Sequence, residues 1–197
     1  GKADFILPAD GECIKEGYNS DENPDDVEIR NAVYSYAFED NYPQAGDYDF
    51  NDIVLNVNLP AAGNDVKELK YIVDLRAVGA VKQLGAGLRI REFDKSNVEE
   101  VSFGAGATQR TNSLNSGIFE NASYETNGNE LVIPLFGDAH YVYGYTGSQR
   151  PMLNTGNAST PLTNIYTLEV NIKLKNAISI PSVTDGLDFF IAYQGGA

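Results

Sequence analysis

Oxygen-bearing side chains crowd one short stretch in the first third of the chain. Between positions 39 and 52 lie five carboxylates, on Glu39, Asp40, Asp47, Asp49 and Asp52, and we group with them the carboxamide of Asn51. Two carboxylates ~6 Å apart repel one another by roughly 0.7 kcal/mol in water, and by several times more where water is scarce. A fold that crowds such groups usually neutralises them with a cation, and Ca²⁺ prefers hard oxygen ligands. The stretch therefore predicts a structural calcium site with these six residues as its ligands.

The spacing in the second half of this stretch narrows the kind of site. Asp47, Asp49 and Asn51 alternate, so on an extended backbone their oxygens would converge on one side. The same spacing matches positions one, three and five of an EF-hand loop, but Asp52 stands where that loop needs Gly, and Asn58 where it needs Glu. We therefore expect a loop-to-strand calcium site. The alternative is that these side chains only cap turns and accept backbone N–H bonds.

Residues suited to catalysis are sparse elsewhere. The chain has one His and one Cys, His140 and Cys13, and it shows neither a Ser–His–Asp arrangement nor a phosphate-binding glycine loop. The acidic pair Glu99-Glu100 belongs to no pattern that would set two carboxyl groups across a sugar cleft, as a glycosidase requires. We therefore expect no enzymatic activity.

Three tyrosines alternate at Tyr141, Tyr143 and Tyr145. On a strand or an extended loop they would form an aromatic face able to stack on sugar rings. Packing in the core or at its rim is the other interpretation, because the chain has 12 Tyr in all, and the absence of Trp weakens the sugar interpretation. A carbohydrate-binding module that uses these tyrosine-rich loops is thus the alternative function.

The elements that must position these residues show a period of two. Apolar and polar residues alternate clearly at 32–38, 53–59, 69–77 and 166–174, and more weakly at 87–93, 98–103, 130–136 and 187–193. Such alternation predicts half-buried strands of antiparallel sheets. Roughly seven to nine strands separated by Gly, Asn, Asp and Pro indicate an all-β fold, an antiparallel, jelly-roll-like two-sheet β-sandwich. We expect its core to contain Ile53, Leu55, Val57, Val73, Leu75, Leu168, Val170 and Ile172.

The remaining segments are expected to be connections and a lead-in. Residues 104–129 and 144–164 are rich in small polar residues and are predicted to be long surface loops, whereas 136–144 has room for one helical turn. Residues 1–30 are polar and acidic and are predicted to be a lead-in or linker. Residues 31–197 would then form a single β-sandwich domain.

The charge balance restricts the partners. The 28 Asp and Glu outnumber the 14 Lys and Arg, which gives a net charge of −14. This excess disfavours nucleic acids and anionic membrane surfaces, because both need basic patches on the protein. No apolar run reaches the ~18 residues of a membrane-spanning helix, so we expect no transmembrane segment.

Several motifs resemble those of a known family. The strings Ala37-Phe38-Glu39-Asp40, Tyr42-Pro43 and Gly46-Asp47-Tyr48-Asp49-Phe50-Asn51-Asp52-Ile53-Val54 look like the signature of LruC-type domains, and residues 75–80 and 85–88 resemble them too. These are domains of unknown function in exported surface lipoproteins of Bacteroides-like bacteria. The resemblance is strong over 33–90, looser to 193 and absent over 1–30. Such domains usually continue beyond a point equivalent to Ala197, so the resemblance implies a C-terminal truncation.

The resemblance also implies where the protein works. It implies an exported, lipid-anchored protein at the cell surface, or a secreted one, with an all-β fold. Together with the acidic stretch, it leads us to expect a non-catalytic β-sandwich module with a structural calcium site and a role in adhesion or as a scaffold. The expected partner is a surface glycan or another envelope protein.

Overall fold

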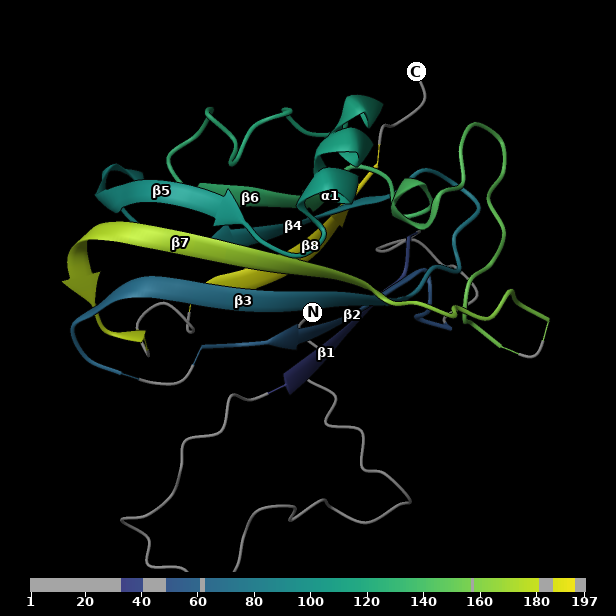
Figure 1. The fold of residues 1–197 in the computed structure, drawn as a ribbon, viewed down its shortest axis with the longest axis horizontal. Helices are drawn as coiled ribbons and strands as arrows, with labels where there is room; N and C mark the ends of the chain where they lie inside the picture. Colours follow the sequence, from purple (N-terminus) through teal and green to yellow (C-terminus); the bar gives the residue numbers. More distant parts are fainter. Residues whose placement is uncertain (1–32, 41–48, 61–62, 157, 181–185, 194–197) are drawn as a thin grey trace, which may run out of the picture.

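Eight antiparallel strands in two sheets make up the part of the fold that the structure describes. The computed structural model describes residues 33–40, 49–60, 63–156, 158–180 and 186–193 (Figure 1). The five-stranded sheet has the order β1-β2-β3-β7-β5 and the three-stranded sheet the order β6-β4-β8. The strands are β1 (Val33–Phe38), β2 (Ile53–Asn58), β3 (Val66–Ala77), β4 (Gly85–Ile90), β5 (Val98–Phe103), β6 (Leu131–Phe136), β7 (Tyr166–Ile178) and β8 (Leu187–Ala192). The short helices are η3 (Lys95–Asn97), α1 (Ala107–Ser113), η4 (Leu114–Ser116) and η5 (Tyr141–Tyr143).

The core lies between the two sheets, as the period of two predicted. Strands account for 44% of the described residues and helices for 12%, which confirms the all-β sandwich. In β2 and β7, buried and partly exposed positions alternate strictly over the segments facing the core. Burying one apolar face of each strand removes it from water, and this is what selects the register. All eight predicted core residues are buried: Ile53, Leu55, Val57, Val73, Leu75, Leu168, Val170 and Ile172.

The strand predicted at 87–93 is shifted in the structure. It is β4, which begins at Gly85 and ends at Ile90. Glu92 has a φ of 54° and lies in a turn, so the chain leaves the sheet before the predicted end. The other weak candidates, β5, β6 and β8, lie within a residue of the predicted bounds.

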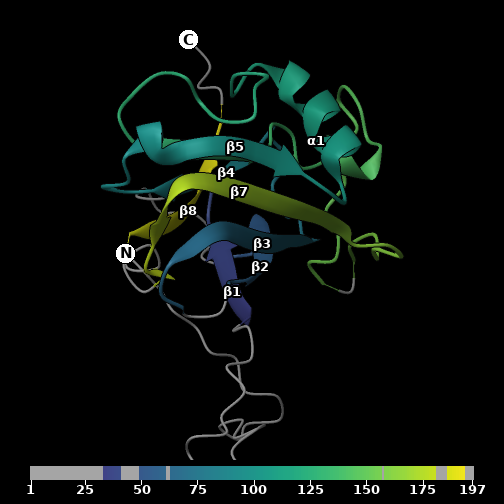
Figure 2. The same ribbon diagram turned by 60° about the vertical axis from the view of Figure 1, so that its left-hand side comes forward.

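One helix lies where a surface loop was expected. The stretch 104–129 contains α1 and η4, and Figure 2 shows α1 beside the end of β5, on the side of the sandwich away from β1. Arg110 of α1 is buried, and its guanidinium donates to the carbonyls of Pro134 and Ala122, each at 2.7 Å. It also lies 3.7 Å from the ring centroid of Phe103. Tertiary contacts therefore hold this helix, and a composition rich in small polar residues conceals it.

The helical turn expected within 136–144 is confirmed as η5. In the described part of the chain, no helix has the length and apolar character needed to cross a membrane. The predicted lead-in at 1–30 and residue Cys13 lie outside the described residues.

Candidate metal centre

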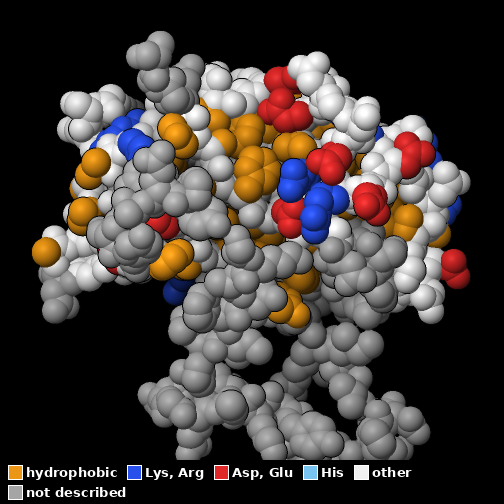
Figure 3. Space-filling model, turned by 180° about the vertical axis from the view of Figure 1, so that it is seen from behind, with side chains coloured by type: hydrophobic (Ala, Val, Ile, Leu, Met, Phe, Trp, Pro, Cys, Tyr) orange, Lys and Arg blue, Asp and Glu red, His pale blue; other side chains and the backbone are white. Residues whose placement is uncertain are grey.

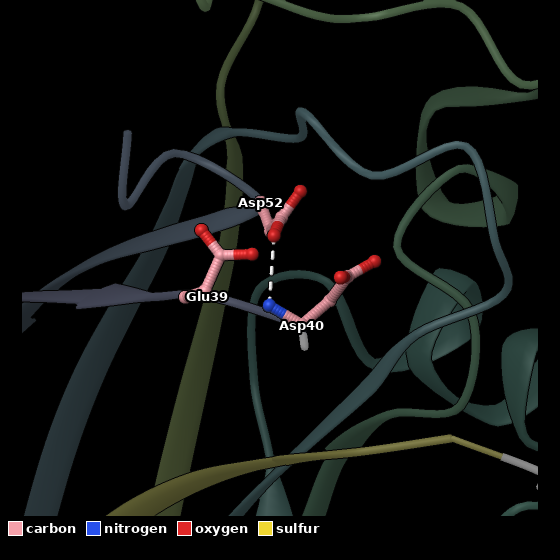
Figure 4. Close-up of side chains that lie close together, drawn as sticks. All are labelled: Glu39, Asp40 and Asp52. Atoms are coloured by element: carbon pink, nitrogen blue, oxygen red, sulfur yellow. Dashed lines mark hydrogen bonds between the residues drawn. The ribbon is translucent and has the colours of Figure 1, made fainter. Parts of the chain in front are cut away.

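Three carboxylates converge where β1 ends and β2 begins. Phe38, the last residue of β1, pairs with Ile53, the first of β2. Glu39 and Asp40 directly follow the first strand and Asp52 directly precedes the second, so antiparallel pairing places them at the same end of the sheet. One carboxylate oxygen from each of the three lies within 4.8 Å of the others (Figure 4).

Burial and hydrogen bonding fix the geometry of this acidic cluster, by which we mean Glu39, Asp40 and Asp52. Glu39 is 7% exposed and Asp52 9%, and the Asp40 side chain is 10% exposed. The backbone N–H of Asp40 donates to Asp52 Oδ2 at 2.7 Å, which ties the two strand ends together. Three carboxylates in so little water repel strongly, and positive charge nearby lowers that cost.

A lysine from a distant segment supplies part of that positive charge. Lys82 Nζ lies 3.1 Å from Asp40 Oδ2 and donates to the Asp40 carbonyl at 3.4 Å. Three carboxylates and one ammonium give the group a formal charge of −2. Lys82 also lies 5.1 Å from the centroid of the Tyr193 ring. Sequence reasoning missed Lys82, because no pattern links positions 42 residues apart.

Two other predicted ligands form a turn of their own. Asp49 Oδ1 accepts the backbone N–H of Asn51 at 3.3 Å, and Asp49 Oδ2 accepts from Asn51 Nδ2 at 2.6 Å. Phe50 between them has a φ of 50°, so the backbone is not extended here and the two side chains do not alternate as on a strand. Among the described carboxylates, Asp49 is thus not part of the acidic cluster, and its partner in this turn is the Asn51 amide. Asp47, the sixth predicted ligand, lies outside the described residues.

Gly79 holds the start of β2 in place. Its backbone N–H donates to the carbonyls of Asn51 at 3.0 Å and Asp52 at 3.1 Å. A Cβ on Gly79 would lie 2.0 Å from Asn51 Oδ1 and 2.9 Å from the Asn51 carbonyl oxygen. Only glycine allows this approach, so Gly79 contributes to the position of Asp52 although it carries no ligand atom.

The cluster offers oxygen ligands to a hard cation. Ca²⁺ takes 6–8 oxygens at about 2.3–2.6 Å, so three carboxylates supply a minority unless some bind in bidentate fashion. Backbone carbonyls and water would complete the shell. Two contacts already stabilise these carboxylates without an ion, the backbone bond to Asp52 and the ion pair to Lys82. The alternative to a metal site is that the carboxylates serve these contacts alone.

The tyrosines expected to form a stacking face are mostly turned inward. Tyr141 and Tyr143 lie in η5, where a period of two does not apply. The Tyr143 hydroxyl donates to the Leu75 carbonyl and accepts the Tyr166 backbone N–H at 3.3 Å, and burial raises the pKa of Tyr143 to about 12. Tyr145 packs against the core and only Tyr141 is exposed, at 37%. Tyr143 and Tyr145 thus follow the second interpretation of these tyrosines, packing in the core or at its rim.

A second surface carries aromatic rings. On the outer side of the three-stranded sheet, Phe190 lies across Gly87, where a Cβ would be 2.6 Å from the ring, and its centroid is 6.1 Å from that of Phe119. Beside them Asp188 binds Arg89 at 2.7 Å and Arg91 at 3.1 Å. Figure 3 looks onto this side and shows an orange patch next to blue side chains bordered by red ones. The charges here are paired, and the rings are half-buried.

Fold and site together define a β-sandwich with an acidic cluster at the junction of its first two strands. The chain belongs to the family described as domain of unknown function (DUF4842), whose match spans residues 64–196. This span begins after the acidic cluster but includes Gly79 and Lys82. No curated protein and no solved structure matches the chain.

Proposed function

We propose that this chain is a non-catalytic β-sandwich module in which one structural Ca²⁺ ties β1 to β2. The observation that carries the proposal is the convergence of Glu39, Asp40 and Asp52 within 4.8 Å from two strand ends. Two of these carboxylates are more than nine-tenths buried, where a divalent cation relieves their mutual repulsion most.

The same burial argues against hydrolytic catalysis at the cluster. A retaining glycosidase holds its two carboxyl groups about 5–5.5 Å apart on either side of a sugar. Glu39 and Asp52 are at most 9% exposed, and Lys82 lies against Asp40, so a sugar ring has no access between them. A cation, which needs only a few ångströms of space, suits this geometry better than a substrate.

The proposed setting follows the resemblance of residues 33–90 to LruC-type domains. We place the module in an exported, lipid-anchored surface protein or a secreted one, where it serves adhesion or acts as a scaffold. Its partner would be a surface glycan or another envelope protein. Extracellular calcium concentrations would keep a site of modest affinity filled.

Thermal unfolding with and without calcium tests the cation site. A ligand at a hundredfold excess over its Kd stabilises the folded state by about 2.7 kcal/mol. Each kcal/mol shifts the Tm of a domain of this size by about 2–4 °C, so calcium should raise the Tm by about 5–11 °C over a chelated sample. Magnesium should raise it less, because it dehydrates reluctantly and demands a tighter octahedron.

Variants locate the response. Asp52→Asn keeps an oxygen to accept the Asp40 N–H but removes a negative charge, so it should abolish the calcium shift. Glu99→Gln is the matched control, because it removes one carboxylate from an exposed ion pair with Lys173 and should leave the shift intact. Asp49→Ala then reports whether the neighbouring turn completes the shell. Identical melting of metal-free protein with calcium and with chelator would favour the turn-capping explanation.

Carbohydrate binding is the second candidate function. Of the three tyrosines expected to bind sugar, only Tyr141 is exposed. On the outer side of the three-stranded sheet, Phe190 and Phe119 form a ring pair beside Arg89 and Arg91. Rings with neighbouring hydrogen-bond donors suit a neutral sugar. A glycan array separates the two surfaces: binding lost in Phe190→Ala but kept in Tyr141→Ala assigns the outer face, the reverse assigns the loop, and no binding by the parent protein removes this candidate.

A further inference from the structure

A second polar cluster, unrelated to the carboxylates above, lies in the connection between β6 and β7. His140 is 1% exposed and Asp138 8%, and the Arg150 side chain is 15% exposed. The Arg150 guanidinium binds Asp138 through two parallel bonds, Nη1 to Oδ1 at 3.1 Å and Nη2 to Oδ2 at 2.8 Å. Such bidentate pairs are the strongest that arginine makes.

The hydrogen bonds of His140 assign its protonation state. Its Nε2 lies 3.1 Å from the Pro151 carbonyl oxygen, which can only accept, so Nε2 carries the proton. Its Nδ1 lies 3.2 Å from Arg150 Nη1, which can only donate, so Nδ1 is the acceptor. The neutral ring thus satisfies both neighbours. A second proton on Nδ1 would remove the acceptor and set two positive charges 3.2 Å apart.

This cluster ties the two ends of residues 138–151 to each other. Asp138 Oδ1 accepts the backbone N–H groups of His140 at 2.9 Å and Tyr141 at 3.2 Å. The His140 carbonyl in turn accepts from two backbone N–H groups further along, each at 3.1 Å. Beyond Pro151, Leu153 exchanges two backbone bonds with Val78, at 2.8 and 3.0 Å. The ring therefore joins the two ends of the segment, at 138–140 and at 150–151.

We propose that His140 is an acid-sensitive lock, which holds residues 138–153 closed while its ring is neutral and releases them when the ring takes a second proton. The proposal does not depend on the calcium site. Among the described residues, the charged groups acting on the ring are Arg150 and Asp138, one on each side of it along the chain.

The direction of the pH dependence follows from the environment of the ring. Burial lowers the pKa of His140 below its usual 6.5, the bond to Pro151 and the charge of Asp138 raise it, and Arg150 lowers it, with a net lowering. The open state binds the proton more readily, so the stability of the closed state is complete above pH 6.5. It is lost as the pH falls from there toward the lowered pKa. One such group raises the opening constant by up to about tenfold per pH unit.

The chain has a single histidine, which makes the test direct. Titrating the imidazole NMR signals of the folded protein in chelator should give a pKa below 6.5, and a value at or above 6.5 would overturn the proposal. Hydrogen exchange of the 138–153 amides, corrected for the intrinsic pH dependence, should show an opening constant that rises severalfold between pH 7.0 and 5.5. Amides of β3 and β7 should show a smaller change.

A variant assigns this effect to the ring. His140→Gln retains an amide donor for the Pro151 carbonyl but cannot titrate, so its opening constant should be independent of pH over the same interval. An opening constant in this variant that rises with acid as it does in the parent would also overturn the proposal. If His140→Gln does not fold, the imidazole titration and the exchange of the parent protein still decide the matter.

Discussion

Gly79 shows how much a residue without a side chain contributes to the candidate metal centre. Its N–H binds the carbonyls of Asn51 and Asp52, and a Cβ would collide with Asn51. Gly79→Ala should therefore cost about 1–3 kcal/mol through overpacking, even though alanine reduces the entropy of the unfolded chain. The Tm should fall by about 2–12 °C.

Gly156→Ala is the control for this prediction, since a Cβ there meets no atom within 4 Å. Its Tm should stay close to that of the parent. Equal melting of the two variants would show that the contact between Gly79 and Asn51 can be given up without cost.

At the residue scale, strand pairing accounts for three of the six residues expected as ligands, and ion binding by the six stays a prediction. Crowded carboxylates pointed to Glu39, Asp40 and Asp52, and strand pairing brings these three together. The convergence expected of Asp49 and Asn51 assumed an extended backbone, and the positive φ of Phe50 removes that assumption. Gly79 and Lys82 could not be predicted as parts of the site from the sequence, because their contacts depend on tertiary structure that no local pattern encodes.

Among the elements, β1 is the strand held least firmly. Its residues are exposed or half-buried, and among the described strands only β2 pairs with it, although Tyr36 packs on Phe189 with ring centroids 4.7 Å apart. Few buried contacts mean a low free energy of local opening. Hydrogen exchange should therefore be faster in β1 than in β3 and β7.

Calcium should slow exchange in β1 in particular, because the proposed ion joins its end to the start of β2. The edge strand β5 of the same sheet is the internal control and should be unaffected. A calcium effect spread equally over β1 and β5 would contradict a site at the β1–β2 junction.

The strands themselves were well predicted, whereas α1 was not. Alternation of apolar and polar residues is imposed by burial of one sheet face, so it is visible wherever a strand packs on the core. The two-turn helix at 107–113 has no such stripe, because its two buried residues, Arg110 and Ser113, are both polar. Burial lowers the pKa of Arg110 to about 10. The Arg110 side chain contacts a backbone carbonyl of Pro134 and the ring of Phe103, and no local sequence pattern reveals such partners.

For the whole molecule, the shared core between the sheets determines stability. Leu55 and Val170 are fully buried in the five-stranded sheet, on β2 and β7, the two strands that flank β3. Leu55→Ala should cost about 2–5 kcal/mol, and Val170→Asp should prevent folding, because it buries a charge among apolar side chains. Chemical denaturation followed by circular dichroism measures both, and parent-like midpoints would mean that these strands face the other way.

Tyr71→Phe is the companion variant. Tyr71 is fully buried, and within the described residues its hydroxyl has no hydrogen-bond partner. Removing that hydroxyl keeps the ring volume and relieves the cost of burying an unsatisfied polar group, so stability should stay the same or rise. Comparison of Leu55→Ala with Tyr71→Phe thus distinguishes loss of packing from a sensitivity of the core to any substitution.

The contact between Lys82 and Asp40 means that the candidate site carries its own tethered counter-ion. Calcium binding would then be an exchange, in which a free divalent ion displaces an ammonium from Asp40 Oδ2, 3.1 Å away. The Lys82 side chain is 37% exposed and that of Asp40 10%, and for this partly exposed pair we take a contribution of about 1 kcal/mol. Lys82→Gln should therefore tighten calcium binding by up to about fivefold in calorimetry while lowering the Tm of the chelated protein slightly. Weaker binding in this variant would instead make Lys82 a support for the ligand geometry and not a competitor of the ion.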